Sequence, residues 1–270
     1  MTITEKAHAK INLTLEILGT RRGDGFHDIA SVMVKVPDLY DTLTFSVSDL
    51  PENAGKITFS CDKAVCEPEK NLAYRAAHAY YDAADKPEKA LPGVFIDLKK
   101  SIPAGAGLAG GSADAAAVLN ALNALFGALS AQTMFDLALS LGSDVPFCLA
   151  DCETALCTGR GEKIEPLAPL HKVRMEVRFP KTPLSTAGIY AEYDRFYTDD
   201  YTKDKSLWLA KAINKHAPLE ELMPYFCNDF QALCEKRCPE IAALCRKLEG
   251  EGAFAQMTGS GSAVFGLWKV

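Results

Sequence analysis

The feature that most constrains this chain is a run of small residues at 103–119, PAGAGLAGGSADAAAVL. Its glycines satisfy two phosphate-binding patterns in part. Gly105-x-Gly107-x-x-Gly110 has the spacing of a dinucleotide-binding turn. The same run falls one residue short of a P-loop, and it carries Gly111 where a P-loop has lysine. Each pattern therefore has to be tested against the residues around it.

The surroundings complete neither pattern. A dinucleotide-binding fold needs a second strand with an acidic residue about 20 residues further on, whereas the region from Phe126, FGALSAQTMFDLALSL, predicts more helix. A P-loop also needs a lysine that reaches the β- and γ-phosphates, and Gly111 at that position has no side chain to do so. Two interpretations remain. The run is a loop that binds an anion through backbone N–H groups and the start of the next helix, or it is a tight turn that caps a buried helix. Ser112, at the expected helix start, can cap the helix or bind phosphate.

The composition is typical of a soluble globular protein, with 48% apolar and 24% charged residues among 270. This length suffices for one large domain or two modest ones. A net charge of −6 argues against a general nucleic-acid or anionic membrane surface. The apolar-rich region 113–141 is too polar for a membrane span, and the N-terminus lacks a signal-peptide core. We expect a cytoplasmic monomer or homodimer with no nucleic-acid or membrane partner.

The nine cysteines indicate buried thiols more than a metal site. Cys227, Cys234, Cys238 and Cys245 are spaced 7, 4 and 7 apart, which places the last three on one face of an expected helix. The cysteines lack a neighbouring histidine at zinc-finger spacing. We therefore predict reduced thiols packed in the core and assign no residue as a metal ligand.

Strand and helix patterns are mixed along the chain without regular alternation. Strand patterns occupy 11–17, 29–36, 42–47, 94–98 and 172–179, and 254–270 predicts two strands around a glycine-rich turn. Helix patterns occupy 71–84, the stretch from the glycine run to 126, 130–142 with Ser130 as N-cap, 185–196, 205–216 and 228–249. The segment 143–160 predicts a loop, a short helix and a strand. This order favours an α+β fold in two lobes, 1–160 and 161–270.

Two further segments carry groups suited to chemistry. In AHAKINLTLEILGTRRGDGFHDI at 7–29, strand alternation puts Lys10 and Asn12 on one face. The strand pattern alone predicts Lys10 as an exposed lysine at a sheet edge. Phe26 and His27 follow a glycine turn, where binding groups are often found. In LGSDVPFCL at 141–149, Asp144 follows a helix end and is either a cap or a functional acid.

Together these segments resemble the GHMP kinases, a superfamily of small-molecule kinases. Its phosphate loop has the form P-x-G-x-G-L-x-G-S/G-S, which Pro103–Ser112 fits. Seven motifs occur in the order seen in one branch of the superfamily and span nearly the whole chain. They are AKINL at 9–13, RxDGFH at 22–27, IPAGAGLAGGSADAA at 102–116, LGSDVPF at 141–147, STAGIY at 185–190, ND at 228–229 and TGSGSAVF at 258–265.

The resemblance implies a two-lobed α+β GHMP-kinase fold, with a nucleotide-binding lobe and a ferredoxin-like lobe. It implies ATP and Mg²⁺ as cofactors, and a small-molecule cytidyl alcohol as the second substrate. It also implies that Asp144 is the catalytic base and Lys10 its partner. The residues implied to bind the nucleotide are Pro103, Ala104, Gly105, Ala106, Gly107, Leu108, Ala109, Gly110, Gly111, Ser112 and Ala113.

The resemblance also implies the contacts to the cytidyl substrate. Asn12 and His27 are implied as substrate contacts, with His27 on the cytosine. Phe26, at a position where the family frequently has tyrosine, and Tyr190 are implied as the aromatic pair that sandwiches the base. Either ring at position 26 can stack on it.

The chain departs from the family pattern at two places, and two rival functions stay open. Ala109 stands where the loop often has glycine, and the chain ends at Val270 where the family commonly runs on, so we expect a C-terminal domain shortened at its end. One rival is another GHMP kinase of the homoserine or mevalonate type. The other is a non-catalytic ATP-binding sensor, against which the retention of Lys10 and Asp144 speaks.

Overall fold

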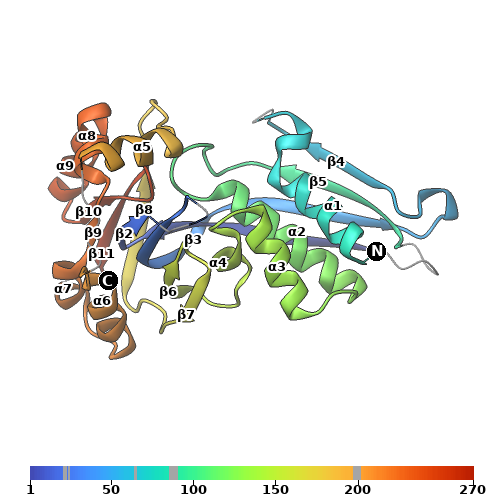
Figure 1. The fold of residues 1–270 in the computed structure, drawn as a ribbon, viewed down its shortest axis with the longest axis horizontal. Helices are drawn as coiled ribbons and strands as arrows, with labels where there is room; N and C mark the ends of the chain where they lie inside the picture. Colours follow the sequence, from blue (N-terminus) through green and yellow to red (C-terminus); the bar gives the residue numbers. More distant parts are fainter. Residues whose placement is uncertain (21–22, 24, 64–65, 85–90, 197–201) are drawn as a thin grey trace. The chain divides into compact units, whose positions relative to one another are not determined.

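The computed structural model describes residues 1–20, 23, 25–63, 66–84, 91–196 and 202–270, and it confirms the expected α+β class (Figure 1). Among these residues, none of the helices has the length and apolar character that a bilayer crossing requires. The chain forms two compact units. Unit 1 comprises 1–9, 37–104 and 109–150, and unit 2 comprises 10–36, 105–108 and 151–270. The expected division at residue 160 is a different partition and stays a prediction.

Unit 1 contains a sheet built on the second half of the long strand β3 (His27–Ser48). Strand β5 (Gly93–Lys99) pairs antiparallel with residues 42–48 of β3, and β4 (Ile57–Cys61) pairs parallel with β5. β1 (Thr2–Asn12) also pairs with β3. Alternate residues of β5 are buried, as expected for strands with one covered face. β4 also alternates partly buried and exposed residues, but the sequence analysis did not assign a strand to this segment.

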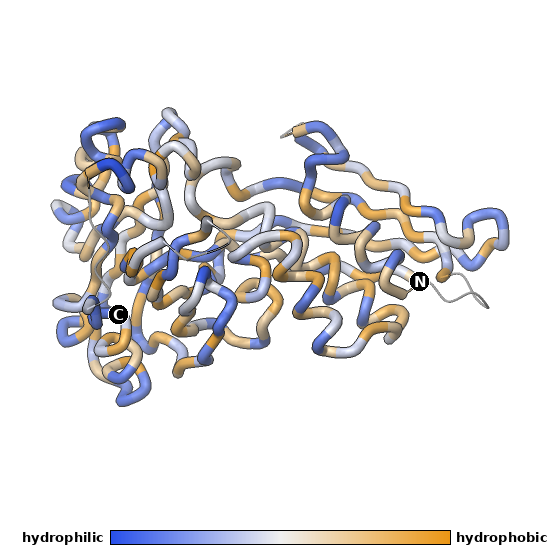
Figure 2. The backbone as a smooth tube through the Cα atoms, in the orientation of Figure 1, coloured by the Kyte–Doolittle hydropathy of each residue, from blue (hydrophilic) through white to orange (hydrophobic). Residues whose placement is uncertain are grey.

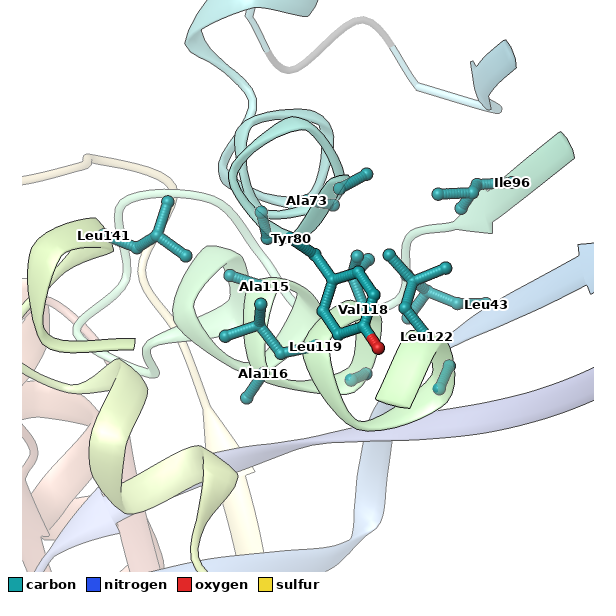
Figure 3. Packing of buried hydrophobic residues seen from close by; sticks show 14 of the residues in the cluster. Leu43, Ala73, Tyr80, Ile96, Ala115, Ala116, Val118, Leu119, Leu122 and Leu141 are labelled. Atoms are coloured by element: carbon teal, nitrogen blue, oxygen red, sulfur yellow. The ribbon is translucent and has the colours of Figure 1, made fainter. Parts of the chain in front are cut away.

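Four helices complete unit 1: α1 (Leu72–Ala84), α2 (Gly110–Phe126), α3 (Ala131–Leu141) and α4 (Val145–Leu149). Figure 1 shows α1 and α3 beside α2, and the tube in Figure 2 is orange along most of α2. Small alanines let the helices approach closely, and the ring of Tyr80 lies against α2 near Val118, Leu119 and Leu122 (Figure 3). The expected N-cap of α3 is confirmed, because Ser130 accepts a hydrogen bond from the Thr133 N–H.

Unit 2 contains the remaining strands of the eight-stranded sheet to which the long β3 belongs, and a separate three-stranded sheet. In the first sheet, the start of β3 pairs antiparallel with β2 (Thr14–Thr20) and with β6 (Thr154–Gly159). β7 (Lys163–Pro166) pairs with β6, and the short β9 (Cys227–Asn228) pairs parallel with β2. The second sheet has the antiparallel order β10 (Phe254–Met257), β11 (Val264–Lys269), β8 (Val173–Arg178). This confirms the two expected C-terminal strands around the glycine-rich turn.

The helices of unit 2 are α5 (Thr186–Phe196), α6 (Lys205–Asn214), α7 (Leu219–Leu222), α8 (Gln231–Arg237) and α9 (Glu240–Gly250). Helix α9 packs on β10 and β11. The first turn of α6 is capped from a distance, because the buried carboxylate of Glu16 on β2 accepts the N–H groups of Lys205 and Ser206. This contact joins residues 190 positions apart, so no local pattern could predict it.

The expected single helix at 228–249 is wrong, because the chain forms two helices there. Pro239 lacks an N–H, and Cys238 before it takes φ −137° and ψ 86°, so the first helix ends at Arg237. Cys234, Cys238 and Cys245 therefore do not share one helix face, although all three are buried free thiols as predicted. Burial raises the pKa of Cys234 and Cys245 to about 12, which keeps them protonated.

Candidate active site

The glycine-rich loop between β5 and α2 has a backbone that only small residues allow. Gly105 and Gly107 have φ angles of 67° and 79°, in the left-handed region. A Cβ added to Gly107 would lie 2.6 Å from the carbonyl oxygen of Thr258, so no side chain fits there. The backbone of the loop at Gly107 therefore lies in close contact with the turn at 258–261, while its close approach to an anion stays a prediction.

Hydrogen bonds from two distant segments fix the middle of this loop in unit 2. The carbonyl oxygen of Ala106 accepts the N–H of Ala263 at 3.0 Å, and that of Leu108 accepts the N–H of Lys10 at 3.1 Å. These two loop carbonyls are therefore occupied by protein donors. This arrangement leaves the loop suited to present N–H groups, rather than carbonyls, to a ligand.

Helix α2 begins without a side-chain cap. Its N-cap is Ala109, with φ 55° and ψ 29°, and no described side chain caps the helix start. The helix begins at Gly110, so Ser112 is its third residue and the expectation that Ser112 marks the helix start is wrong. The first N–H groups of a helix have no partner within the helix. An uncapped, glycine-lined N-terminus of a 17-residue helix favours the anion-binding interpretation over a simple cap.

Lys10 and Asn12 lie on one face of β1, as predicted, and both are buried, with 4% and 1% of their surface exposed. Lys10 Nζ donates to Asn12 Oδ1 at 2.8 Å. The strand-based expectation of an exposed edge lysine is therefore wrong. A buried ammonium requires oxygen partners to offset its lost hydration, and the nearby amide oxygen supplies one.

The C-terminal glycine turn joins this strand through Thr258, which the sequence did not single out. The backbone N–H of Asn12 donates to Thr258 Oγ1 at 2.8 Å, and this hydroxyl lies 3.3 Å from Asn12 Oδ1. Asn228 ties the same turn down, because its Nδ2 donates to the carbonyl oxygens of Met257 and Gly259. Four of the sequence motifs (AKINL, the glycine run, ND and TGSGSAVF) therefore meet in unit 2.

His27 and Tyr190 also come together in unit 2, from β3 and α5. Their ring centroids lie 4.9 Å apart with an interplanar angle of 42°. His27 Nε2 lies 2.6 Å from Asp194 Oδ1, one turn further along α5. Phe230 packs edge-on against Tyr190 with centroids 4.7 Å apart. The sequence did not predict Asp194 or Phe230, because neither residue lies within one of the seven motifs.

Phe26 has a different described neighbour from the one expected. Its side chain is 45% exposed, and the guanidinium of Arg160 lies 4.5 Å from its ring centroid. Its pairing with Tyr190 around a base stays a prediction. Arg22 and Asp24 of the RxDGFH motif lie outside the described residues.

Asp144 lies in unit 1, at the residue before α4. It occupies the N-cap position, yet its carboxylate makes no capping hydrogen bond to this helix. The capping interpretation is therefore not supported by the described contacts. The Cβ position of Gly142, two residues earlier, would lie 4.0 Å from Ser112 Oγ, so this segment passes close to the first turn of α2. Lys10 belongs to unit 2, and its pairing with Asp144 stays a prediction.

A buried charge cluster that the sequence did not predict lies at the base of the loop in unit 1. Lys100 Nζ donates to Asp41 Oδ2 and, at 2.6 Å, to Asp114 Oδ2. Burial, reinforced by Asp41, raises the pKa of the Asp114 carboxyl to about 7 because it outweighs the opposing effect of Lys100. Burial also opposes the charge of Lys100, but Asp114 and Asp41 prevail and raise its pKa.

Family profiles match both parts of the chain. The profile of the GHMP kinases N-terminal domain matches residues 71–151, and that of the GHMP kinases C-terminal domain matches residues 209–269. The chain therefore belongs to the GHMP kinases, a family of ATP-dependent small-molecule kinases. The two-lobed fold expected from the sequence motifs is the fold of this family.

Within this family the similar proteins share one name. The 4-diphosphocytidyl-2-C-methyl-D-erythritol kinases of Caldanaerobacter subterraneus subsp. tengcongensis and Pelotomaculum thermopropionicum are 38% and 40% identical to the chain, covering 99% of it and 88% and 89% of their own lengths. A crystal structure of 4-(cytidine 5'-diphospho)-2C-methyl-D-erythritol kinase matches with TM-score 0.77 and 33% identity, over 98% of this chain and 90% of that chain.

More distant structures share the fold alone. The homoserine kinase of Cytophaga hutchinsonii matches with TM-score 0.71 at 16% identity, over 99% of this chain and 85% of that chain. Identity this low carries no information about the substrate.

The left-handed backbone at Ala109 generates a prediction about stability. An L-residue with a Cβ pays a steric cost in this region that glycine avoids, so we expect Ala109→Gly to raise the free energy of unfolding by about 1 kcal/mol. The measurement is urea denaturation of the whole chain. Ala104→Gly is the matched control, since Ala104 lacks a positive φ and glycine there should lower the stability. Equal destabilisation by both variants would contradict the argument.

Proposed function

We propose that this protein transfers the γ-phosphoryl group of ATP to the 2-hydroxyl group of 4-diphosphocytidyl-2-C-methyl-D-erythritol, in the non-mevalonate route to isoprenoid precursors. The observation that carries the proposal is the full-length similarity, at 36–40% identity, to kinases of that name. The geometry agrees with it, because an uncapped helix start follows a loop whose middle is bound to the strand of Lys10 and Asn12.

The acceptor hydroxyl needs a base, because an alkyl hydroxyl is a poor nucleophile at neutral pH. We assign this role to Asp144, whose carboxylate stands at the start of α4 without capping it. We assign to Lys10 the role of stabilising negative charge on the reacting oxygen atoms. Its ammonium is already oriented by Asn12 Oδ1, which limits the reorganisation needed during the reaction.

The phosphates of ATP would lie on the glycine-rich loop. The N–H groups of residues 110–112 and the positive end of the α2 dipole favour an anion at this point. Mg²⁺ is usually held by phosphate oxygens with one or two protein ligands. We propose that the Mg²⁺ ion binds together with ATP, through the phosphate oxygens. Such an ion neutralises phosphoryl charge during transfer.

The cytosine would be recognised by the group around His27. Tyr190 supplies an aromatic ring, and the rings of Phe230 and His27 both pack against it. Asp194 Oδ1 lies 2.6 Å from His27 Nε2, which fixes the ring orientation and hence which ring nitrogen faces the base. Phe26 is exposed enough to supply a second face.

The rivals have less support. A homoserine or mevalonate-type kinase would share the fold, but the sequence identity to the homoserine kinase and phosphomevalonate kinase structures is only 16%. A non-catalytic sensor would not require a buried lysine on β1, where the Lys10 N–H contacts the glycine-rich loop. We also propose a cytoplasmic location, since the nine cysteines are free thiols.

The proposal is tested with the purified chain, ATP, Mg²⁺ and the cytidyl alcohol. We expect ADP formation that depends on the acceptor, and a product with a new phosphate on the 2-hydroxyl, identified by ³¹P NMR and mass spectrometry. Homoserine and mevalonate are the comparison acceptors. Transfer to either of these and not to the cytidyl alcohol would reject the proposal.

Removal of the proposed base has a defined kinetic consequence. Asp144→Asn should lower kcat by about 10²–10⁴-fold, while affinity for a non-hydrolysable ATP analogue stays within about twofold, a difference under 1.4 kcal/mol. Asp136→Asn on the neighbouring α3, where the acid is exposed, is the matched control and should keep the wild-type kcat. A wild-type kcat in Asp144→Asn would remove the base assignment.

The stacking role of Tyr190 predicts a selective effect on one substrate. Loss of the ring should cost about 1–3 kcal/mol, so Tyr190→Ala should raise KM for the cytidyl alcohol by about tenfold or more and change KM for ATP much less. Tyr190→Phe keeps the ring and should lose far less. Steady-state kinetics with each substrate varied in turn gives both KM values, and equal changes in the two would argue against stacking.

A further inference from the structure

The cluster of Asp41, Lys100 and Asp114 lies outside the groups used in the proposed reaction. All three residues are more than nine-tenths buried. They come from three elements: Asp41 from β3, Lys100 from the residue after β5, and Asp114 from α2. A buried ion cluster costs desolvation and is weak evidence for stability on its own. Stability alone therefore does not explain why this cluster lies beside the two ends of the glycine-rich loop.

Asp41 holds the entry to the glycine-rich loop. Its Oδ1 accepts the backbone N–H groups of Ser101 and, at 2.8 Å, Ile102, the two residues before Pro103. A carboxylate that accepts two backbone N–H groups fixes the direction of the chain at this point. The loop therefore begins from an anchored backbone.

Asp114 holds the exit from the loop, since it lies in the first turns of α2. Lys100 Nζ bridges the two ends, because it donates to Asp41 on the entry side and to Asp114 on the exit side. The ends also touch directly. A Cβ on Gly110 would lie 2.9 Å from Ile102 Cγ2 and 3.4 Å from Lys100 Nζ. A side chain at position 110 would therefore crowd Ile102, so the two ends of the loop lie close together.

We propose that Asp41, Lys100 and Asp114 form a loop clamp, a set of positioning residues that holds both ends of the glycine-rich loop and so preorganises its N–H groups for the phosphates of ATP. The clamp rests on the proposed function in that the loop must bind the nucleotide. Preorganised donors stabilise an anion better than donors that must reorient. Loss of the Lys100–Asp114 link frees the start of α2 from the loop entry.

The unpaired oxygen of Asp114 agrees with this role. Among the described residues, Asp114 Oδ1 is buried without a hydrogen-bond partner, an arrangement that costs free energy. The carboxyl is therefore poorly suited to stabilise the fold, and its elevated pKa expresses the same cost. What Asp114 does provide is an acceptor for Lys100 at a fixed point of α2.

The test compares two substitutions at Asp114. Asp114→Ala removes the acceptor but keeps the Lys100–Asp41 pair, so no buried charge loses its partner. Asp114→Asn keeps an amide oxygen that can accept from Lys100. Calorimetry with the whole chain, Mg²⁺ and a non-hydrolysable ATP analogue should give an affinity about tenfold weaker for Asp114→Ala, equivalent to about 1.4 kcal/mol. Asp114→Asn should bind the analogue within about twofold of wild type, a much smaller change than the tenfold loss expected for Asp114→Ala.

Two further measurements separate the clamp from a purely structural role. In the folded Asp114→Ala protein, KM for ATP should rise while KM for the acceptor alcohol stays the same. Asp114→Leu fills the lost volume with an apolar side chain and should show the same nucleotide defect with stability at or above that of Asp114→Ala. Wild-type nucleotide affinity in folded Asp114→Ala or Asp114→Leu overturns the clamp. Failure of the wild-type chain to bind the analogue at all would instead overturn the proposed function.

Discussion

The hydrogen bonds of one buried residue, Asn12, join β1, β3 and the C-terminal glycine turn in unit 2. Its Oδ1 accepts from Lys10 Nζ, its backbone N–H donates to Thr258, and its Nδ2 donates to Ser31 on β3. Each of these groups would be costly to bury without its partner. These bonds link the position of Lys10, the path of β1 and the C-terminal turn. The glycine-rich loop is hydrogen-bonded to both segments, so its position depends on the same bonds.

Much of the fold was predictable because local patterns govern it. The Ser130 cap, the helix 72–84 and the paired C-terminal strands depend on neighbouring residues, and the structure confirms them. The single helix at 228–249 failed at Pro239, where the missing N–H decides the local conformation. The glycine run predicted a loop with close backbone contacts, either an anion-binding loop or a tight turn, because small residues admit such contacts without any tertiary partner.

The rest of the site depends on contacts between residues far apart in sequence. Lys10 seemed an exposed lysine by strand pattern, since nothing near it shows that Asn12 and the glycine loop enclose it. The clamp residues Asp41, Lys100 and Asp114 were not predicted because each is an ordinary polar residue in its own segment. Their relation exists only after β3, β5 and α2 have packed. The sequence motifs were enough to locate the glycine-rich loop, whereas the residues that contact its two ends became visible only in the folded structure.

The bond between Asn12 and Thr258 spans 246 positions of the chain. Because Thr258 is synthesised long after Asn12, this hydrogen bond cannot form until the segment that carries Thr258 has been made. Unit 1 ends at residue 150 and has no such delay. Long sequence separation also slows folding, because a large loop must close before the contact gives any stability. The contact between Asn12 and Thr258 therefore forms late in the folding of the chain, after the local contacts of unit 1.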